Sequence, residues 1–595
     1  MDELIRNLKS RRIAVYTAGE LEYERSVANA NLLFRYARPD CVVQPDSAWQ
    51  IQKIVQEVKK VNEAKSQGIS IVVKNGGHSY AGFSTSDRGS ISLDLVKMNH
   101  VEIDKESMTA TIEGGAVWAH AYRQLVNNHM DGYVINGGRC PSVGVSGFIL
   151  GGGLSPFTRT FGMGCDGLKE ATIVLADGRL ITVGENDDAT TNEGKLFWAL
   201  RGAGGGNFGV VVEVKLSIYR LREIEKPSDD GTGVISGRYT WSPKPSEKDM
   251  TEFMETMKKF YITPWPNSMT IDSTWICRLG YKDGELEVRF PVYFNGIKED
   301  FDQIINEHIG EKHHLSKKLT RRCWQDKSTR FLHENLVSQW SEETQKALPS
   351  NASYRIFTSL CFKADQRDDE GNNIFVRITE TLRKEMAAFR QKFVGEEGTL
   401  QVTFIHAGGK ATGPASNATA FPWREAVYHA YIQMEWTDKW LELDMRGFCQ
   451  RLKEELKPFS IEKGAAFINF PDGDLPPGQH ESVYYGNNRH DLQRVKQIWD
   501  KDNFFKWKQG VGLPPTSQTP AATAGKKDDD PAAPQGDSAL DSQVLTDKLA
   551  KEQWEKFDPS TALELAASLP FFPLGWALIP GLVAGLKSAR LAGGE

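Results

Sequence analysis

Three glycine-rich loops, all before residue 210, constrain the fold and the chemistry of this chain more than any other feature of its sequence. The loops are Gly76-Gly77-His78-Ser79, Gly151-Gly152-Gly153 and Gly204-Gly205-Gly206-Asn207-Phe208-Gly209. Glycine adopts positive φ without steric strain and lets backbone N–H groups approach an anion closely. One such loop alone is more often a simple turn, but three in one region indicate a ligand that carries phosphate.

The third loop contains the pattern G-x-G-x-x-G, at Gly204, Gly206 and Gly209, which suggests a dinucleotide site of the Rossmann type. That fingerprint requires a strand before the loop and a helix after it. Here the helix-like run LFWALR (196–201) precedes the loop, and the strand-like run VVVEVKL (210–216) follows it. Because the order is reversed, we reject a Rossmann interpretation.

The spacing of apolar residues predicts an α/β region followed, after about residue 222, by a region of α+β character. In the first region we expect strands at 41–45, 69–75 and 210–221, a helix at 47–67, short strands within 91–117, and a hairpin over 171–183 whose Asp177-Gly178 favours a type I′ turn. Beyond it we expect helices at 246–261, 297–308, 366–391, 439–457 and 488–500, and strands near 284–293, 399–407 and 427–436.

Composition and charge exclude several classes of function. The net charge of −6 and the lack of a long Lys/Arg run argue against a nucleic-acid partner. The seven cysteines form no C-x-x-C pair, so no metal site is expected. The first residues are charged and lack the apolar core of a secretory signal, which favours an intracellular, cytoplasmic location.

The last part of the chain differs in composition from the rest. Residues 514–543 are rich in Pro, Ala, Ser, Thr and Asp and are expected to form a disordered linker, followed by a tail at 544–595. The tail contains an uncharged run of 18 residues, 569–586, a borderline length for a membrane span. Three prolines in this run disfavour a straight helix, so membrane contact and docking on a partner stay open as alternatives.

Four segments carry a recognisable family pattern: KNGGHSYAGFS (74–84), RCPSVGVSGFILGGGLSPFTRTFGMGCDGLKEATIVLADG (139–178), LFWALRGAGGGNFGVVVEVKL (196–216) and YYGNNRHDLQRVKQIWDKDNFFKWKQGV (484–511). Together they resemble the berberine-bridge-enzyme-like branch of the vanillyl-alcohol oxidase superfamily over roughly 38–220 and 400–512. The resemblance implies an α+β fold: a two-subdomain PCMH-type FAD-binding domain with an inserted substrate domain built on an antiparallel sheet flanked by helices. The implied division is a lead-in at 1–37, the FAD domain at 38–221, the substrate domain at 222–465, and a segment returning to the FAD domain at 466–513.

The same resemblance implies FAD bonded at two points, through His78 to the flavin 8α-methyl group and through Cys140 to flavin C6. A lone histidine in such a loop is usually a local hydrogen-bonding residue, and a lone cysteine is usually a small buried hydrophobe. Both residues lie in full family motifs, which favours the linking roles. The other FAD contacts that the resemblance implies are Asn75, Gly76, Gly77, Ser79, Val143, Gly144, Ser146, Gly151, Gly152, Gly153, Asn207, Phe208, Gly209, Val211, Tyr485 and Asn487.

The family reaction would transfer a hydride from a C–H bond of a small-molecule alcohol or amine, a secondary metabolite or a carbohydrate, to the flavin. Electrons then pass to O₂ and give hydrogen peroxide, because the flavin carries the redox chemistry. Val143 lies three residues after Cys140, where the resemblance places the oxygen-reactive face of the flavin. A small valine at this position favours an oxidase, although Val143 could also serve packing alone.

The catalytic base is harder to assign, because the family motif Y-x-N-Y-x-D reads Phe467-Ile468-Asn469-Phe470-Pro471-Asp472 here, and Phe470 has no hydroxyl. The strand predicted at 427–436 offers alternatives: His429 and Tyr431 share one face with Gln433. In relatives, acid–base groups occupy positions matching His429 and Tyr431, and histidine titrates near neutrality. The alternative for both is an ordinary sheet residue.

Two further functions remain open beside the oxidase. The missing motif tyrosine is compatible with a flavin-dependent cyclase, either oxidative or redox-neutral. A third hypothesis is a non-catalytic flavin-binding protein. Peroxide formation would separate the oxidase from the non-catalytic protein, and the mass of the product would separate it from a redox-neutral cyclase.

Overall fold

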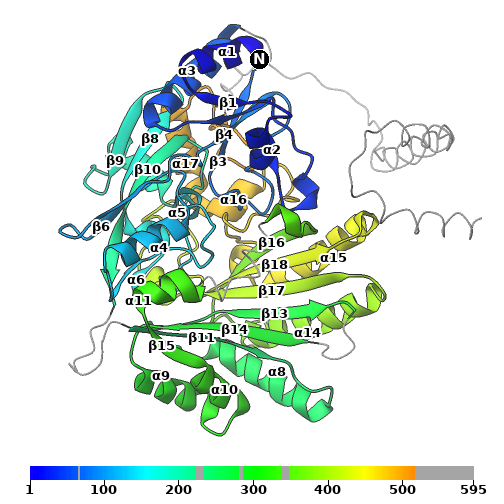
Figure 1. The fold of residues 1–595 in the computed structure, drawn as a ribbon. Coiled ribbons are helices and arrows are strands. Elements are labelled where there is room, and N and C mark those ends of the chain that lie inside the picture. Colours follow the sequence, from blue (N-terminus) through cyan, green and yellow to red (C-terminus); the bar gives the residue numbers. More distant parts are fainter. Residues whose placement is uncertain (65–67, 222–232, 281–285, 337–347, 516–595) are drawn as a thin grey trace, which may run out of the picture. The chain divides into compact units, whose positions relative to one another are not determined.

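The computed structural model describes residues 1–64, 68–221, 233–280, 286–336 and 348–515, and these residues form one compact unit built on three sheets (Figure 1). The linker and tail expected from residue 516 onward, including the apolar run at 569–586, lie outside the described residues. Within the described part, no helix is both long enough and apolar enough to span a membrane.

The first sheet has the order β1-β2-β4-β3. It consists of β1 (Ala14–Tyr16), β2 (Cys41–Gln44), β4 (Ser90–Asp94) and β3 (Ser70–Lys74); the last three are parallel and β1 is antiparallel to β2. Helix α3 (Ala48–Ala64) buries Ile51, Ile54 and Val58 against this sheet together with α1 (Asp2–Ser10). The lead-in at 1–37 thus contributes a strand and a helix to this layer and does not stand apart from it.

The second sheet is antiparallel, with the order β5-β6-β10-β8-β9, and β7 pairs with the far end of β10. Its strands are β5 (Val101–Asp104), β6 (Thr109–Glu113), β7 (Tyr133–Ile135), β8 (Leu168–Leu175), β9 (Leu180–Gly184) and β10 (Gly209–Arg220). The associated helices are α4 (Trp118–Asn127), α5 (Val145–Leu150), α6 (Thr158–Phe161) and α7 (Asn192–Leu200). The third glycine loop therefore runs from helix α7 into strand β10, the order that excluded a Rossmann site.

The hairpin between β8 and β9 corrects one expectation. A type I′ turn needs positive φ at both central residues, but in this turn only Gly178 is left-handed, at +82°. The N–H of Gly178 donates to the carbonyl of Leu175, and the N–H of Leu175 donates to the carbonyl of Arg179. This is a three-residue loop that ends in a left-handed glycine, and Asp177 keeps an ordinary conformation because the extra residue absorbs the strand twist.

The third sheet is antiparallel and contains β15, β11, β14, β13, β17, β18 and β16 in this order, with β12 paired to β14. The strands are β11 (Gly233–Trp241), β12 (Met269–Ile271), β13 (Ser273–Arg278), β14 (Glu287–Phe294), β15 (Cys323–Lys327), β16 (Tyr354–Phe362), β17 (Gly398–His406) and β18 (Tyr428–Trp436). Helices α8 (Glu247–Ile262), α14 (Ile374–Lys392) and α15 (Glu442–Leu456) cover one face (Figure 1). Smaller helices are α2 (Leu21–Val27), α9 (Lys298–Ile305), α10 (His314–Arg322) and α11 (Ser328–Arg330). The expected α+β architecture is confirmed.

Helix α14 begins eight residues later than predicted, because a turn precedes it. Gly371 has φ of +82°, and its N–H donates to the carbonyl of Asp368. The side chain of Asn373 then accepts from the N–H of Phe375 and caps the helix, as asparagine commonly does at this position.

The C-terminal segment packs against elements of the first two sheets. Helices α16 (His480–Tyr485) and α17 (Arg489–Trp499) lie among the strands of these sheets in Figure 1, and α17 packs on α7. The buried ammonium of Lys496 donates to the carbonyl of Asn207, which ties α17 to the third glycine loop.

Candidate active site

A cavity of about 590 Å³ lies where the three sheets meet. One wall comes from the loop after β3, the segment 138–148 and the third glycine loop. The opposite wall comes from the uncovered face of β16 and β18 and from residues 467–471. We call these the cofactor wall (residues 74–79, 138–148 and 204–211) and the substrate wall (355–357, 431–433 and 467–471). A volume of this size suits a ligand larger than a single ring.

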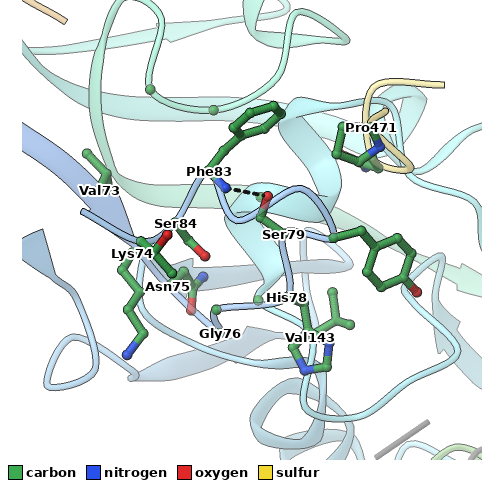
Figure 2. A pocket seen from close by; sticks show the side chains of 18 of the residues that line it. Val73, Lys74, Asn75, Gly76, His78, Ser79, Phe83, Ser84, Val143 and Pro471 are labelled. Atoms are coloured by element: carbon green, nitrogen blue, oxygen red, sulfur yellow. Dashed lines mark hydrogen bonds between the residues drawn. The ribbon is translucent and has the colours of Figure 1, made fainter. Parts of the chain in front are cut away.

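His78 and Cys140 come together on the cofactor wall, although 61 residues separate them in the sequence. The Oγ atom of Ser142 lies 2.9 Å from Nε2 of His78 and 3.3 Å from Sγ of Cys140. Burial lowers the pKa of His78 to about 4, so its imidazole is neutral at physiological pH. Figure 2 shows His78 at the end of the glycine loop with Val143 beside it, and Val143 also lines the cavity.

The loop that carries His78 is held by Asn75. Its Nδ2 donates to the carbonyl of Gly114 and to Oγ of Ser146, which in turn donates to the same carbonyl. Its Oδ1 is buried, lines the cavity region and has no hydrogen-bond partner among the described residues. A buried acceptor without a partner is costly in a finished protein, so a bound ligand that donates a hydrogen bond would satisfy it.

Two positions of this wall require glycine, Gly76 because of a neighbouring backbone and Gly144 because of the Asn75 side chain. A Cβ on Gly76 would lie 2.7 Å from the N atom of Gly144 and from the carbonyl O of Ser142, and one on Gly144 would lie 2.5 Å from the Asn75 side chain. No side chain fits at either position. The 74–79 loop and the 140–146 segment thus pack backbone to backbone, which brings His78 against Ser142.

The third glycine loop is open where it faces the cavity. A Cβ on Gly205 would meet only Leu150, at 3.7 Å, and one on Gly206 would meet only Trp507, at 3.8 Å. Gly209 and Val211 also line the cavity. Gly206 has φ of +72°, which by itself favours glycine, but neither backbone conformation nor packing explains glycine at 205. A ligand that lies against the backbone does, and the fit to an extended phosphate-bearing cofactor such as FAD is good.

The second glycine loop lies outside the cavity lining. A Cβ on Gly151 would lie 2.0 Å from Oδ1 of Asn469, and Gly152 and Gly153 have φ of +115° and +75° against the rings of Phe467 and Phe148. In the structure these glycines serve a tight turn and close packing. They contact the cofactor wall only indirectly, through side chains such as that of Phe148.

Four other candidates for cofactor contact also lie away from the cavity. Asn207 is buried, and its Oδ1 accepts from Nε1 of Trp507 and from the N–H of Val511. Phe208 belongs to the core of the second sheet. Tyr485 is fully buried and donates its hydroxyl to the carbonyl of Ala203, whereas Asn487 is exposed. Asn207 and Tyr485 hold the glycine loop in place from behind.

The substrate wall is aromatic. Tyr431 projects from β18 into the cavity and packs on Phe470, with ring centroids 4.8 Å apart. Tyr80 stacks on Phe357 of β16 at 4.0 Å and also meets Phe470 at 5.9 Å. Phe470 thus occupies the cavity as the motif position implies, and two tyrosine hydroxyls lie in its neighbourhood.

His429 lies behind this wall and does not line the cavity. Its Nδ1 is 3.4 Å from Sγ of Cys361, and its ring packs on Phe467 and Phe421. Burial lowers its pKa to about 3 and raises that of the Cys361 thiol, so both groups are neutral. The strand alternation is as predicted, but β18 enters the cavity only from Tyr431 onward.

The far end of the cavity is polar. Gln433 is 1% exposed, and its Nε2 donates to Oε2 of Glu435 at 3.3 Å. Because a carboxylate only accepts, the amide nitrogen must face Glu435, and Oε1 is the atom left without a partner among the described residues. Glu435 also pairs with Arg355 at 3.4 Å.

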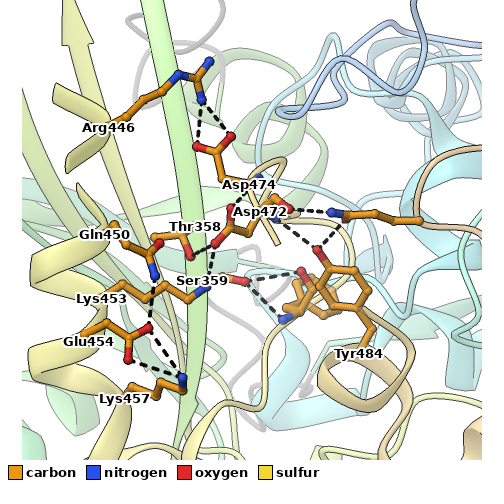
Figure 3. A network of polar contacts seen from close by, with 12 residues as sticks. Thr358, Ser359, Arg446, Gln450, Lys453, Glu454, Lys457, Asp472, Asp474 and Tyr484 are labelled. Atoms are coloured by element: carbon orange, nitrogen blue, oxygen red, sulfur yellow. Dashed lines mark hydrogen bonds and ion pairs between the residues drawn. The ribbon is translucent and has the colours of Figure 1, made fainter. Parts of the chain in front are cut away.

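The loop that carries Phe470 is anchored by a buried ion pair (Figure 3). Oδ2 of Asp472 accepts from Nζ of Lys453 at 2.6 Å and from the hydroxyl of Thr358 at 2.8 Å. The N–H of Asp472 donates to the hydroxyl of Tyr484. Helix α15, strand β16 and the C-terminal segment therefore meet at one carboxylate, directly behind the substrate wall.

Sequence reasoning missed Ser142, Tyr80, Phe357 and Arg355. Ser142 and Tyr80 lie inside the family motifs, two residues after Cys140 and two after His78. A hydroxyl so near each linking residue was the signal that could have identified them. Phe357 and Arg355 come from β16, a strand that the apolar spacing did not reveal, and nothing local marks them.

Comparison with known proteins agrees with this geometry. The family described as FAD binding domain matches residues 39–184, and the family described as berberine and berberine like matches 466–512. An uncharacterized FAD-linked oxidoreductase of Bacillus subtilis is 24% identical over 506 residues, 84% of this chain and 96% of the relative. Berberine bridge enzyme-like 17 of Arabidopsis thaliana is 25% identical over 475 residues, 76% of this chain and 82% of the relative.

Solved structures share the fold. The berberine bridge enzyme from Eschscholzia californica has a TM-score of 0.69 at 20% identity, covering 86% of this chain and 99% of that chain. Chitooligosaccharide oxidase has a TM-score of 0.66 at 19% identity with the same coverage. The fold, the cavity and the two matched families define an FAD-dependent oxidoreductase. Within that class, the chain resembles the berberine-bridge-enzyme-like FAD-linked oxidoreductases over both matched segments.

Proposed function

We propose that this chain is an oxidase that holds FAD through two covalent bonds, at His78 and Cys140, and oxidises a small-molecule alcohol or amine with O₂ as electron acceptor. The observation that carries the proposal is the meeting of His78 and Cys140 at Ser142. The two linkage positions, 8α and C6, lie on the same ring of the flavin. Two side chains that bond to them must therefore approach one edge of that ring from adjacent points.

Bound FAD would supply hydride acceptance at N5 and electron transfer to O₂. The residues of this chain hold and orient the substrate and handle its proton. Val143, next to the linking residues on the cavity surface, leaves room for O₂ because its side chain is short. This supports oxidase behaviour over a dehydrogenase that passes its electrons to another acceptor.

We assign the role of base to Tyr431. It lines the cavity, whereas His429 is enclosed by Cys361, Phe421 and Phe467 and has a pKa of about 3, too low to accept a proton at neutral pH. The ring of Tyr80 lies beside it, with centroids 6.1 Å apart.

The substrate carries a hydrogen-bond donor. Gln433 lines the cavity, and its Oε1 is an acceptor without a partner among the described residues. The stacked rings of Tyr80 and Phe357 favour a flat or ring-shaped body next to that donor. A cyclic alcohol, phenol or amine fits these features.

The test begins with the cofactor. Purified wild type, His78→Ala and Cys140→Ala are precipitated with acid, and the intact mass of each denatured chain is measured. The two bonds are supported if the wild type and both single variants keep the mass of FAD and the double variant, His78→Ala with Cys140→Ala, loses it. Release of all flavin from the denatured wild type contradicts them. Peroxide formation is then measured with cyclic alcohols and amines under O₂.

One observation favours a second candidate, a flavin-dependent cyclase. Phe470 fills the position of the motif tyrosine and closes an aromatic cluster with Tyr431 and Tyr80, which could hold a substrate in a folded conformation for ring closure. Product mass separates this function from simple oxidation. A flavin-binding protein without activity would form no product with any donor and would give no peroxide.

A further inference from the structure

Ser142 contacts both candidate flavin-linking side chains through the same atom. Its Oγ lies 2.9 Å from Nε2 of His78 and 3.3 Å from Sγ of Cys140. His78 and Cys140 line the cavity, and the backbone packing of Gly76 on Ser142 and Gly144 holds Ser142 beside them. A hydroxyl has one proton to donate and two lone pairs to accept with, so it can serve two partners in opposite senses.

The contact with His78 selects a tautomer. A neutral imidazole has one N–H and one bare nitrogen, and only the bare nitrogen is nucleophilic. When Nε2 donates its proton to Oγ of Ser142, the lone pair is on Nδ1. In this arrangement Nδ1 is the ring nitrogen that can form a bond.

The contact with Cys140 uses the remaining function of the same hydroxyl. In the arrangement in which the His78 N–H donates to Oγ, the Ser142 O–H is available to donate to Sγ of Cys140, 3.3 Å away. A hydrogen bond donated to sulfur stabilises the thiolate, which is the nucleophilic form of cysteine. One orientation of one hydroxyl therefore prepares both side chains.

We propose that Ser142 is a positioning residue for flavin attachment, which sets His78 in the Nδ1-nucleophilic tautomer and stabilises the Cys140 thiolate. The inference rests on the proposed two-bond attachment. In each attachment one C–H of the flavin and one N–H or S–H of the chain are broken, and one N–C or S–C bond forms. The two hydrogens reduce the flavin, and O₂ then accepts them as H₂O₂, so the oxidised cofactor is restored each time.

The test compares Ser142→Thr with Ser142→Val, because threonine and valine have the same shape and differ only in the hydroxyl. The full chain is produced as apoprotein in a riboflavin-starved auxotroph, and FAD is added. Samples are denatured over time, and covalent FAD is measured by intact mass. The C140A background reports the bond at His78, and the H78A background reports the bond at Cys140.

The threonine variant should attach FAD within about twofold of the wild-type rate, and the valine variant should be at least tenfold slower in both backgrounds. Equal rates for the two variants overturn the inference, as does slowing in only one background, since the hydroxyl would then not serve both residues. Melting curves of the two variants, with Ser142→Ala as a smaller substitute, exclude misfolding as the cause. If the wild type itself carries no covalent FAD, the proposed two-bond attachment is wrong. That result differs from equal attachment rates in the two variants, which would contradict only the role of Ser142.

Discussion

The two walls of the cavity are built in different ways. The cofactor wall consists of loops in which backbone meets backbone, and its key positions are glycines with no space for a side chain, such as Gly76 and Gly144. The substrate wall consists of side chains that project from two strands, chiefly Tyr431 and Phe357, and of a loop held from behind. Backbone geometry tolerates almost no substitution, whereas projecting side chains can change without disturbing the sheet. The first wall suits an invariant cofactor, and the second suits a substrate that differs between relatives.

The largest effect is expected at Tyr431. Tyr431→Phe removes the proposed base and should slow reduction of the flavin by a factor of about 10² to 10⁴, the usual contribution of general base catalysis. Flavin content should not change, because the cofactor wall is untouched. Anaerobic stopped-flow reduction with a substrate from the peroxide screen measures the rate.

Tyr428→Phe is the matched control for this experiment. Tyr428 lies on the same strand but faces the helices and donates to the carbonyl of Tyr261. Its variant should reduce at nearly the wild-type rate. Equal reduction rates for Tyr431→Phe and the wild type would remove Tyr431 from the mechanism.

Lys453→Met tests the support behind the substrate wall. The change leaves Asp472 buried without its ion pair, and breaking such a pair from one side typically destabilises a protein by about 3–5 kcal/mol. Urea unfolding measures the loss. The exposed pair of Arg494 and Asp491 is the control, since Arg494→Ala should cost less than about 1 kcal/mol. Equal losses in the free energy of unfolding would mean that the buried pair of Lys453 and Asp472 stabilises the protein no more than the exposed pair does.

Gly205→Val sharpens the contrast on the cofactor wall. The new side chain would project into the cavity and meet only Leu150 in the protein. FAD content should fall at least tenfold while the melting temperature of the apoprotein stays nearly constant. Gly151→Ala should show the opposite, because its Cβ clashes with Asn469 of the substrate wall and does not project towards the cofactor wall. If both variants lose stability alike, the loop at 205 has a packing role.

Gln433→Leu should raise KM about tenfold with little change in kcat, because it removes one buried hydrogen bond to the substrate. Gln401→Leu is the control: Gln401 lies opposite Gln433 in the sheet register but does not line the cavity. Steady-state kinetics are measured with one substrate and with its analogue that lacks the donor group. The KM for that analogue should be the same in wild type and Gln433→Leu.

The smallest effect concerns pH. His429 has a folded pKa of about 3 and an ordinary unfolded value of about 6.5, so above pH 6.5 it is neutral in both states and has no effect. As the pH falls from 6.5 towards 3, His429 binds a proton in the unfolded chain but not in the folded chain, so the free energy of unfolding decreases. His429→Gln should reduce the slope of the free energy of unfolding against pH in this range, by the equivalent of up to one bound proton. An unchanged slope would mean that His429 is protonated in the folded state.

The two walls also differ in what the sequence could reveal. The glycine loops, His78 and Cys140 are contiguous motifs, and local chemistry was enough to place them in one site. The segment Gly151–Gly153 carries the same local signal, but the structure places it in packing contacts with Asn469 and Phe148, which no local pattern encodes. On β18, the period-2 pattern assigned Tyr431 and His429 to one face correctly. It could not show where along the strand the cavity begins, because that depends on Phe421 and Phe467 from distant segments.

The anchoring of the third glycine loop has a consequence for how the protein is made. Asn207 reaches its final hydrogen bonds only with Trp507 and Val511, some 300 residues further along the chain. A ribosome that has synthesised the first two sheets has therefore not yet produced a finished cofactor pocket. The backbone of the third glycine loop is therefore fully supported only after residue 511 has been synthesised and folded back.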